Sequence, residues 1–133
     1  MAFDHERLDV YRVSLQFVAW SYRLSGALRG LDRHARDQLL RASQSIPLNI
    51  AEGNGKRPGP DRRRFWHIAY GSTLECAAVL DVLAACNSIA PADAAEGKQI
   101  LHRIVGMLAR MTAVGETVRE ENAEYSGGGE EME

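Results

Sequence analysis

The chain has 133 residues, which is enough for one domain with a hydrophobic core and excludes two such domains. Hydrophobic residues make up 45% and charged residues 26%, as in ordinary globular proteins, and no apolar run approaches the roughly 20 residues that span a bilayer, so we expect no membrane partner. The net charge of -2 is unevenly divided: residues 1–70 carry 12 basic and 7 acidic side chains (net +5), and residues 71–133 carry 4 and 11 (net -7). This asymmetry predicts either an anionic partner for the first half or two poles that attract each other between subunits.

Helical periodicity without strand-like alternation predicts an all-α protein. The expected helices span residues 8–28, 33–52, 61–89 and 91–123. Asp32 is placed to cap the second helix, and Gly53 and Gly55 are expected to end it in the left-handed conformation. We therefore expect a single domain over residues 1–125, followed by a disordered, glycine-rich, acidic tail over residues 126–133.

The first helix carries apolar residues on two stripes that lie roughly 160° apart around its axis. One stripe holds Leu8, Tyr11, Leu15, Val18 and Tyr22, and the other holds Val10, Val13, Phe17, Trp20, Leu24 and Ala27. A helix of an isolated bundle needs only one apolar face. This helix is therefore either deeply buried with a few exposed aromatics, or packed against another subunit. We favour the second interpretation, with an oligomer interface formed by Val13, Phe17, Trp20 and Leu24.

The middle of the chain gives three smaller indications. Small residues recur on the second and third helices and predict a close approach of the two: Ala42, Ser43, Ser45, Ala69, Ser72 and Cys76. Pro47 lies inside the second helix, where it removes a backbone donor and predicts a tolerated kink. Cys76 and Cys86 are ten residues apart, a spacing that suits neither a disulfide nor a zinc knuckle, so both are expected to be small core residues.

Two motifs resemble those of a known family. The sequence reads QLLRASQSIPLNIAEGNGKR over residues 38–57 and FWHIAYGSTLE over residues 65–75, with an opening L-x-V-Y at residues 8–11. Together they resemble the four-helix-bundle proteins encoded in intervening sequences of large-subunit (23S) rRNA genes. Lys56 departs from the pattern, because that family usually has arginine directly after the second glycine.

The resemblance implies an antiparallel up-down four-helix bundle that assembles into an oligomeric ring, commonly a homopentamer. The family is related to the accessory proteins of diversity-generating retroelements, which bind a reverse transcriptase and nucleic acid through a basic surface. For most members no biochemical activity is established. The resemblance therefore implies self-association, with RNA, DNA or a reverse-transcriptase-like protein as the expected partner.

Four polar residues are embedded in the motifs: Arg41, Asn49, Glu52 and Glu75. Arg41 could reach the carboxylate of Glu75 on the neighbouring helix. We interpret the four as a structural set that fixes helix register or a subunit contact, because no metal, base or nucleophile accompanies them. A buried Arg41–Glu75 pair would make Glu75→Ala cost about 3 kcal/mol.

A basic cluster with a neighbouring aromatic is the candidate nucleic-acid site: Lys56, Arg57, Arg62, Arg63, Arg64 and Trp66. Lysine and arginine bind phosphates, and an aromatic ring beside them can stack on a base. A ring would repeat the cluster around one rim and multiply its field. The alternative is a solvated loop with its aromatic residues in the core.

The evidence for an enzyme is weak. Arg62 and His67, like Arg29 and His34, have the R-x4-H spacing of small helical RNases, but the polar residue usual after the arginine is missing. We therefore expect a non-enzymatic scaffold or adaptor without metal, cofactor or small-molecule substrate, and hold a small helical RNase as the alternative. The charged N-terminus shows no export signal, so we expect a cytoplasmic protein.

Overall fold

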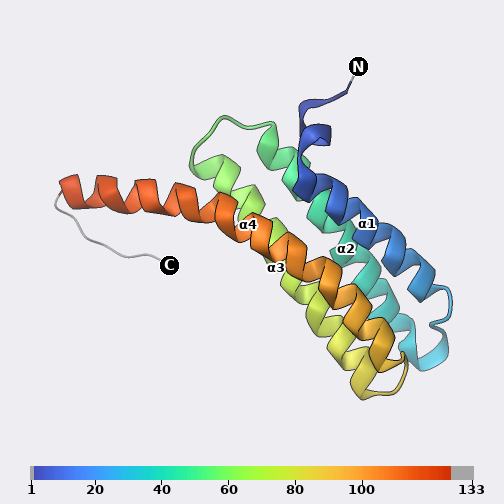
Figure 1. The fold of residues 1–133 in the computed structure, drawn as a ribbon. Helices are drawn as coiled ribbons and strands as arrows, with labels where there is room; N and C mark the ends of the chain where they lie inside the picture. Colours follow the sequence, from blue (N-terminus) through green and yellow to red (C-terminus); the bar gives the residue numbers. More distant parts are fainter. Residues whose placement is uncertain (1, 127–133) are drawn as a thin grey trace.

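A computed structural model describes residues 2–126, with side chains as far as residue 113. Its helices are η1 (Asp4–Arg7), α1 (Asp9–Ser25), η2 (Gly30–Asp32), α2 (Arg33–Asn54), α3 (Pro60–Ala85) and α4 (Pro91–Ser126) (Figure 1). No strand occurs within this part of the chain, so the all-α prediction is confirmed. The predicted acidic tail lies outside the described residues, except for its first residue, Ser126.

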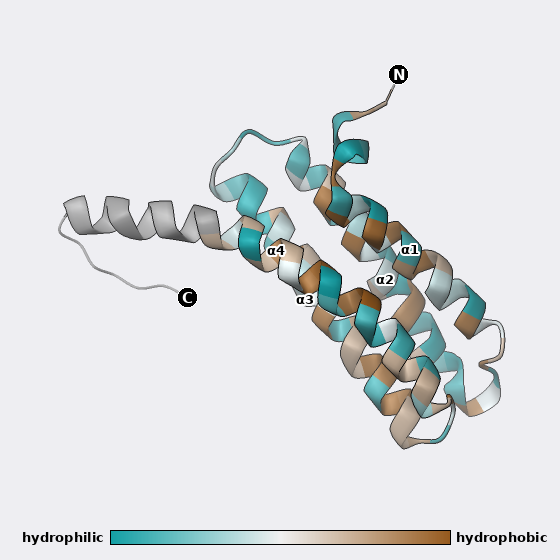
Figure 2. Ribbon diagram, in the orientation of Figure 1, coloured by the Kyte–Doolittle hydropathy of each residue, from teal (hydrophilic) through white to brown (hydrophobic). Residues whose placement is uncertain are grey.

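The four long helices form an antiparallel up-down bundle with a square cross-section. α1 packs against α2 and α4, and α3 packs against the same two helices, so α1 and α3 lie on one diagonal (Figure 1). The predicted four-helix bundle is therefore confirmed. Hydrophilic residues gather on the connection between α2 and α3 (Figure 2).

A hydrogen bond joins the α1–α2 connection to the α3–α4 connection, at the end of the bundle opposite the α2–α3 connection. The Ser88 hydroxyl donates a hydrogen bond of 2.6 Å to Asp32 Oδ1, which ties the α3–α4 connection to the start of α2. Asp32 is the N-terminal cap residue of α2, as predicted, but its side chain makes no hydrogen bond to the backbone of the first turn. Its carboxylate instead holds a neighbouring loop.

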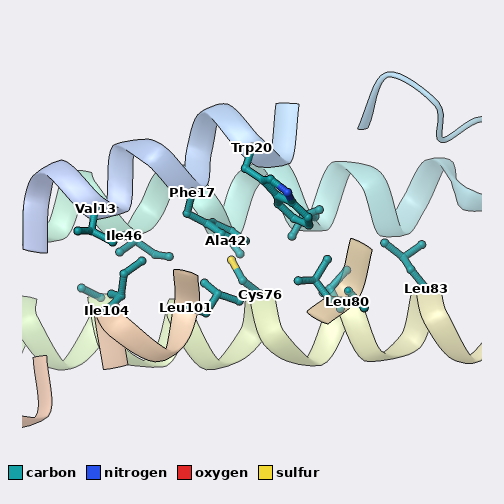
Figure 3. Packing of buried hydrophobic residues seen from close by; sticks show 14 of the residues in the cluster. Val13, Phe17, Trp20, Ala42, Ile46, Cys76, Leu80, Leu83, Leu101 and Ile104 are labelled. Atoms are coloured by element: carbon teal, nitrogen blue, oxygen red, sulfur yellow. The ribbon is translucent and has the colours of Figure 1, made fainter. Parts of the chain in front are cut away.

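The apolar stripe predicted to form a subunit interface is part of the core, so that prediction is wrong. Val13, Phe17 and Trp20 are buried inside the single chain (Figure 3). Leu24 packs against the same core cluster. The other stripe of α1 is the one that faces outward, with Leu15 43% and Tyr22 53% exposed. Periodicity finds two apolar stripes on this helix, but it contains nothing that says which of them faces the other three helices.

The predicted close approach of α2 and α3 is confirmed. The Ser72 hydroxyl donates a hydrogen bond of 2.8 Å to the Ser45 hydroxyl, and Ala42 faces Cys76 across the core (Figure 3). Pro47 is buried and α2 continues through it without interruption. Small side chains on both helices allow their backbones to come near each other, because nothing larger has to fit between them.

The apolar composition of α3 follows from this position. Its length and hydropathy, 26 residues with a mean of 1.4 over an 18-residue window, would also suit a membrane span. Core helices commonly meet the same criterion, and α3 packs against α2 along one side and α4 along another. Only 33% of that window is buried inside the bundle, so packing accounts for part of the composition and leaves apolar residues such as Ile68 and Val82 exposed.

The two cysteines have different environments. Cys76 is buried, as predicted, but Cys86 is exposed, so the prediction of a second core cysteine is wrong. Cys86 is the residue after the last turn of α3 and no longer follows the inward stripe of that helix. Burial away from water, with a contribution from the Glu75 carboxylate, raises the pKa of the Cys76 thiol from 9.0 to about 12.

We expect a thiol reagent to label one cysteine in the folded chain, Cys86, and to label Cys76 only after denaturation.

The raised pKa of Cys76 also makes the stability of the fold depend on pH. Above pH 9 the unfolded thiol loses its proton while the folded thiol keeps it, so the free energy of unfolding falls by up to about 1.4 kcal/mol per pH unit toward pH 12. Denaturation of the parent and of Cys76→Ala at pH 8 and pH 10 measures this contribution. Rapid labelling of Cys76 in folded Cys86→Ser would contradict the burial of that thiol, on which both the labelling and the pH prediction depend.

Candidate nucleic-acid interface

The basic cluster lies where the chain turns from α2 into α3. α2 ends at Asn54, and Gly59, with φ of 152°, has a backbone conformation that side chains other than hydrogen rarely allow. Pro60 then opens α3 with its fixed φ. Gly55, in contrast, is right-handed with φ of -77°, and Gly53 is inside α2, so the predicted left-handed caps at these two residues are wrong.

Arg62 holds the end of α2. Its Nε donates to the carbonyls of Gly53 (3.2 Å) and Lys56 (3.0 Å), and its Nη2 donates to the carbonyl of Asn54 (3.0 Å). The last carbonyls of a helix have no intrahelical donor, and a cation there also opposes the negative end of the helix dipole. Arg62 is therefore a capping residue, not a free phosphate ligand.

Trp66 packs against the same helix end. A Cβ added at Gly53 would lie 2.7 Å from both Cδ1 and Nε1 of the Trp66 indole, so only glycine leaves room for the ring. The Arg62 guanidinium stands 5.3 Å from the ring centroid. Trp66 is half-buried and its indole nitrogen has no acceptor among the described residues. Because the indole packs against Gly53 and the Arg62 guanidinium, the base-stacking role predicted for Trp66 is not supported.

The remaining cations of the cluster differ in how freely they can bind an anion. Lys56 forms an ion pair with Glu52 at 3.6 Å, and Arg64 forms one with Asp61 at 3.1 Å. Both cations also make cation–π contacts with the Phe65 ring. Arg57 is exposed and Arg63 is half-buried, and no ion pair to either occurs within residues 2–113. The cluster therefore offers two unpaired guanidiniums rather than five equivalent charges.

The predicted buried pair of Arg41 and Glu75 is wrong. Both side chains are exposed, and in the described part of the chain no ion pair joins them. The Gln38 amide instead donates to Glu75 Oε2 at 3.3 Å. The expected cost of about 3 kcal/mol for Glu75→Ala no longer follows, because exposed charges are solvated on their own.

The motif residues nevertheless share one feature that the sequence reading missed. Arg41, Ser45, Asn49 and Glu52 follow each other at spacings of four, four and three, and so form one strip along α2. Asn49 bonds within the strip, donating to the Ser45 carbonyl at 2.8 Å and to its hydroxyl at 3.0 Å. Ser45 joins this strip to Ser72 of α3. Helical spacing alone could have placed these residues on one outward surface.

The residues of the RNase alternative lie in different surroundings. His67 lines a pocket of about 290 Å³ between α3 and α4, together with Tyr70, Ala109 and Thr112. Arg62 already uses Nε and Nη2 to cap α2. Arg29 and His34 are exposed on either side of η2, and neither lines a described pocket. Within residues 2–113 no group of three His, Cys, Asp or Glu side chains could hold a metal ion. Arg62 is not among the described residues that line the pocket beside His67.

Comparisons with known proteins agree with the architecture. The family model described as 23S rRNA-intervening sequence protein matches residues 6–110. A crystal structure of a protein of unknown function from the S23 ribosomal protein family of Bacteroides thetaiotaomicron is similar, with a TM-score of 0.71 and 21% identity over 77% of this chain and 97% of that one. At this identity the likeness shows the fold alone. The chain matches no curated protein.

Proposed function

The chain belongs to the family of 23S rRNA-intervening sequence proteins, and on that basis we propose that it is a non-enzymatic scaffold that assembles with copies of itself. One observation carries the proposal: apolar side chains of α1 and α2 that are exposed or half-exposed follow one another as a strip on the outer surface, namely Leu15, Val18, Tyr22 and Leu48. Scattered exposed apolar residues are normal, whereas a contiguous patch is typical of an interaction surface.

Contacts between α1 and α2 place the members of the strip side by side. The Gln44 amide donates to the Tyr22 hydroxyl at 2.8 Å. Leu48 lies one turn further along α2 and Val18 one turn earlier along α1, and because the helices are antiparallel these two lie at the same level. Leu15 continues the strip by another turn. Leu48 is 67% exposed, so the strip has no cover within the single chain.

A closed ring needs a second, different face on every subunit, since head-to-tail contacts join unlike surfaces. α3 supplies one. Ile68 is 41% and Val82 54% exposed, and their separation of fourteen residues puts them within about 40° on the same side of α3. The strip on α1 and α2 of one copy would then pack on this side of α3 in the next copy.

We expect Leu15→Glu/Leu48→Glu to dissociate the assembly into folded monomers, because each glutamate would be desolvated in the contact. Leu31→Glu is the matched control, since Leu31 is fully exposed at η2, away from the strip. Native mass spectrometry at micromolar concentration gives the subunit number, and circular dichroism checks the fold. A monodisperse monomer for the unaltered chain would overturn the proposal.

We propose a second role, contact with nucleic acid through the α2–α3 connection, supported by the unpaired guanidiniums of Arg57 and Arg63. Binding should weaken steeply with salt, because phosphate contacts release counterions. We expect Arg57→Glu/Arg63→Glu to abolish retardation of a short single-stranded RNA at about 50 mM salt while the assembly stays intact. Arg62 is left unchanged in this variant because its loss would free the end of α2. If the unaltered protein does not retard the RNA, the nucleic-acid role is overturned and only the scaffold role is kept.

A further inference from the structure

A cleft of about 490 Å³ lies between the first and last helices, on the side of the bundle opposite the α2–α3 contact. Its α1 wall includes Asp9, Arg12 and Gln16, and its α4 wall includes Arg103, Gly106 and Arg110. The volume is within the range of about 300–1,000 Å³ that is typical of small-molecule sites.

The cleft carries an excess of positive charge in a protein whose net charge is -2. Three arginines face one carboxylate, Asp9, and that carboxylate is already paired with Arg12. Arg12 also donates to the Glu6 carbonyl at 2.9 Å, so its guanidinium is held in place from two sides. Arg103 and Arg110 have no ion pair within the described residues. Unneutralised like charges side by side repel each other, and a bound anion would relieve that repulsion.

The Arg110 guanidinium lies over the cleft floor. A Cβ added at Gly106 would be 3.6 Å from Arg110 Nη1, so the side chain folds back along α4 by one turn. Arg103 is two turns before Arg110 on the same face, a rise of about 10 Å. Because the Arg110 side chain folds back toward Arg103, the two guanidiniums can come closer together than this rise and bind the phosphates of one polyanion. Guanidinium is the side chain best matched to phosphate.

An apolar recess of about 360 Å³ adjoins the cleft and shares Asp9, Met107 and Arg110 with it. The rest of its lining is Leu8, Val10 and Met111. Methionine is flexible and polarisable, so it packs readily against flat aromatic groups. A ligand that filled both spaces would have phosphates at one end and an apolar, aromatic group at the other.

We propose that the cleft and the recess together bind a nucleotide, with its phosphates on Arg103 and Arg110 and its base against Met107 and Met111. The site lies on the α1–α4 side and shares no residue with the pair Arg57 and Arg63, although it is at the same end of the bundle as the α2–α3 connection. It does not depend on self-association. The phosphate chemistry is shared by a free nucleotide and by the exposed end of a nucleic-acid strand.

Isothermal titration with ATP, tripolyphosphate and a short single-stranded RNA tests the site. We expect ATP to bind, and more tightly than tripolyphosphate, because only ATP fills the recess. Arg103→Gln/Arg110→Gln should weaken ATP binding at least tenfold. Arg29→Gln/Arg33→Gln removes the same charge from exposed arginines at η2 and the start of α2, and should leave binding unchanged. Met111→Gln should weaken ATP but not tripolyphosphate.

The remaining outcomes also decide the matter. Binding of the RNA alone, lost in Arg103→Gln/Arg110→Gln but kept in Arg57→Glu/Arg63→Glu, would support the same phosphate site with a strand as its source. Equal losses in the cleft variant and in Arg29→Gln/Arg33→Gln would mean unspecific attraction and overturn the proposal, as would the absence of binding by all three probes. Arg103 and Arg110 are exposed, so circular dichroism should show that their variants are folded. Met111 is half-buried against the core, so only a Met111→Gln protein with the parent's circular dichroism reports on the base contact.

Discussion

Phe17→Ala should lower the free energy of unfolding by about 3–5 kcal/mol. Phe17 is fully buried, and its ring stacks on that of Trp20 with centroids 5.5 Å apart. Removing the ring takes away the favourable transfer of its apolar surface from water and leaves a cavity between helices that cannot fully close. Equilibrium unfolding in urea, followed by circular dichroism at one fixed protein concentration, measures the loss.

Leu15→Ala is the control on the same helix. Leu15 is 43% exposed, so its truncation should cost well under the value for Phe17 in the monomer. If the chain assembles through the outer strip of α1 and α2, Leu15→Ala should instead make stability depend more strongly on concentration. If the two variants lost similar free energies of unfolding in the monomer, the burial of Phe17 and the exposure of Leu15 would both be refuted.

Gly97→Ala should destabilise the bundle by about 1–3 kcal/mol, although alanine is the better helix former. A Cβ at Gly97 would overlap Cη2 of Trp20 and lie 2.8 Å from Cδ1 of Leu80. The Trp20 indole is rigid and buried, so the added methyl can be accommodated only by moving α4 away from α1. Thermal and urea denaturation would show this as a lower midpoint.

Gly71→Ala provides the matched comparison, since Gly71 is also inside a helix but a Cβ there would meet nothing within 4 Å. Helix propensity alone should make Gly71→Ala more stable by roughly 0.5–1 kcal/mol. A second comparison places Gly97→Ala in a Trp20→Leu background, where the two changes should be less costly together than their sum. If Gly97→Ala stabilised the parent chain as Gly71→Ala does, the close contact with Trp20 would be refuted.

The helices were predictable because each depends on local signals. Pro91 begins α4 as predicted, and the helix predicted from residue 61 begins one residue earlier, at Pro60. The small residues on α2 and α3 correctly predicted where those helices meet. The orientation of α1 was not predictable, because both of its faces are apolar and only the tertiary packing chooses between Phe17 and Leu15. Gly53 was misread for a related reason: its role is to admit Trp66, a contact between residues thirteen apart.

The candidate sites were less predictable than the fold. A run of basic residues shows where charge is, but not which guanidiniums already have partners, and Arg62 proves to be bonded to three carbonyls. The cleft between α1 and α4 gave no signal in the sequence, since Arg12 and Arg110 are almost a hundred residues apart. Such a site exists only once the bundle has closed.

The contact between α1 and α4 has a consequence for how the bundle opens. Helices that follow each other along the chain are joined by short connections, whereas α1 and α4 meet only after the whole chain has turned back on itself. Of the four helix contacts, the α1–α4 contact closes the longest loop and costs the most loop entropy. This contact should therefore form late in folding and separate early in unfolding. A molecule held across this contact would act as a clasp between the two ends of the chain and prolong the lifetime of the closed bundle.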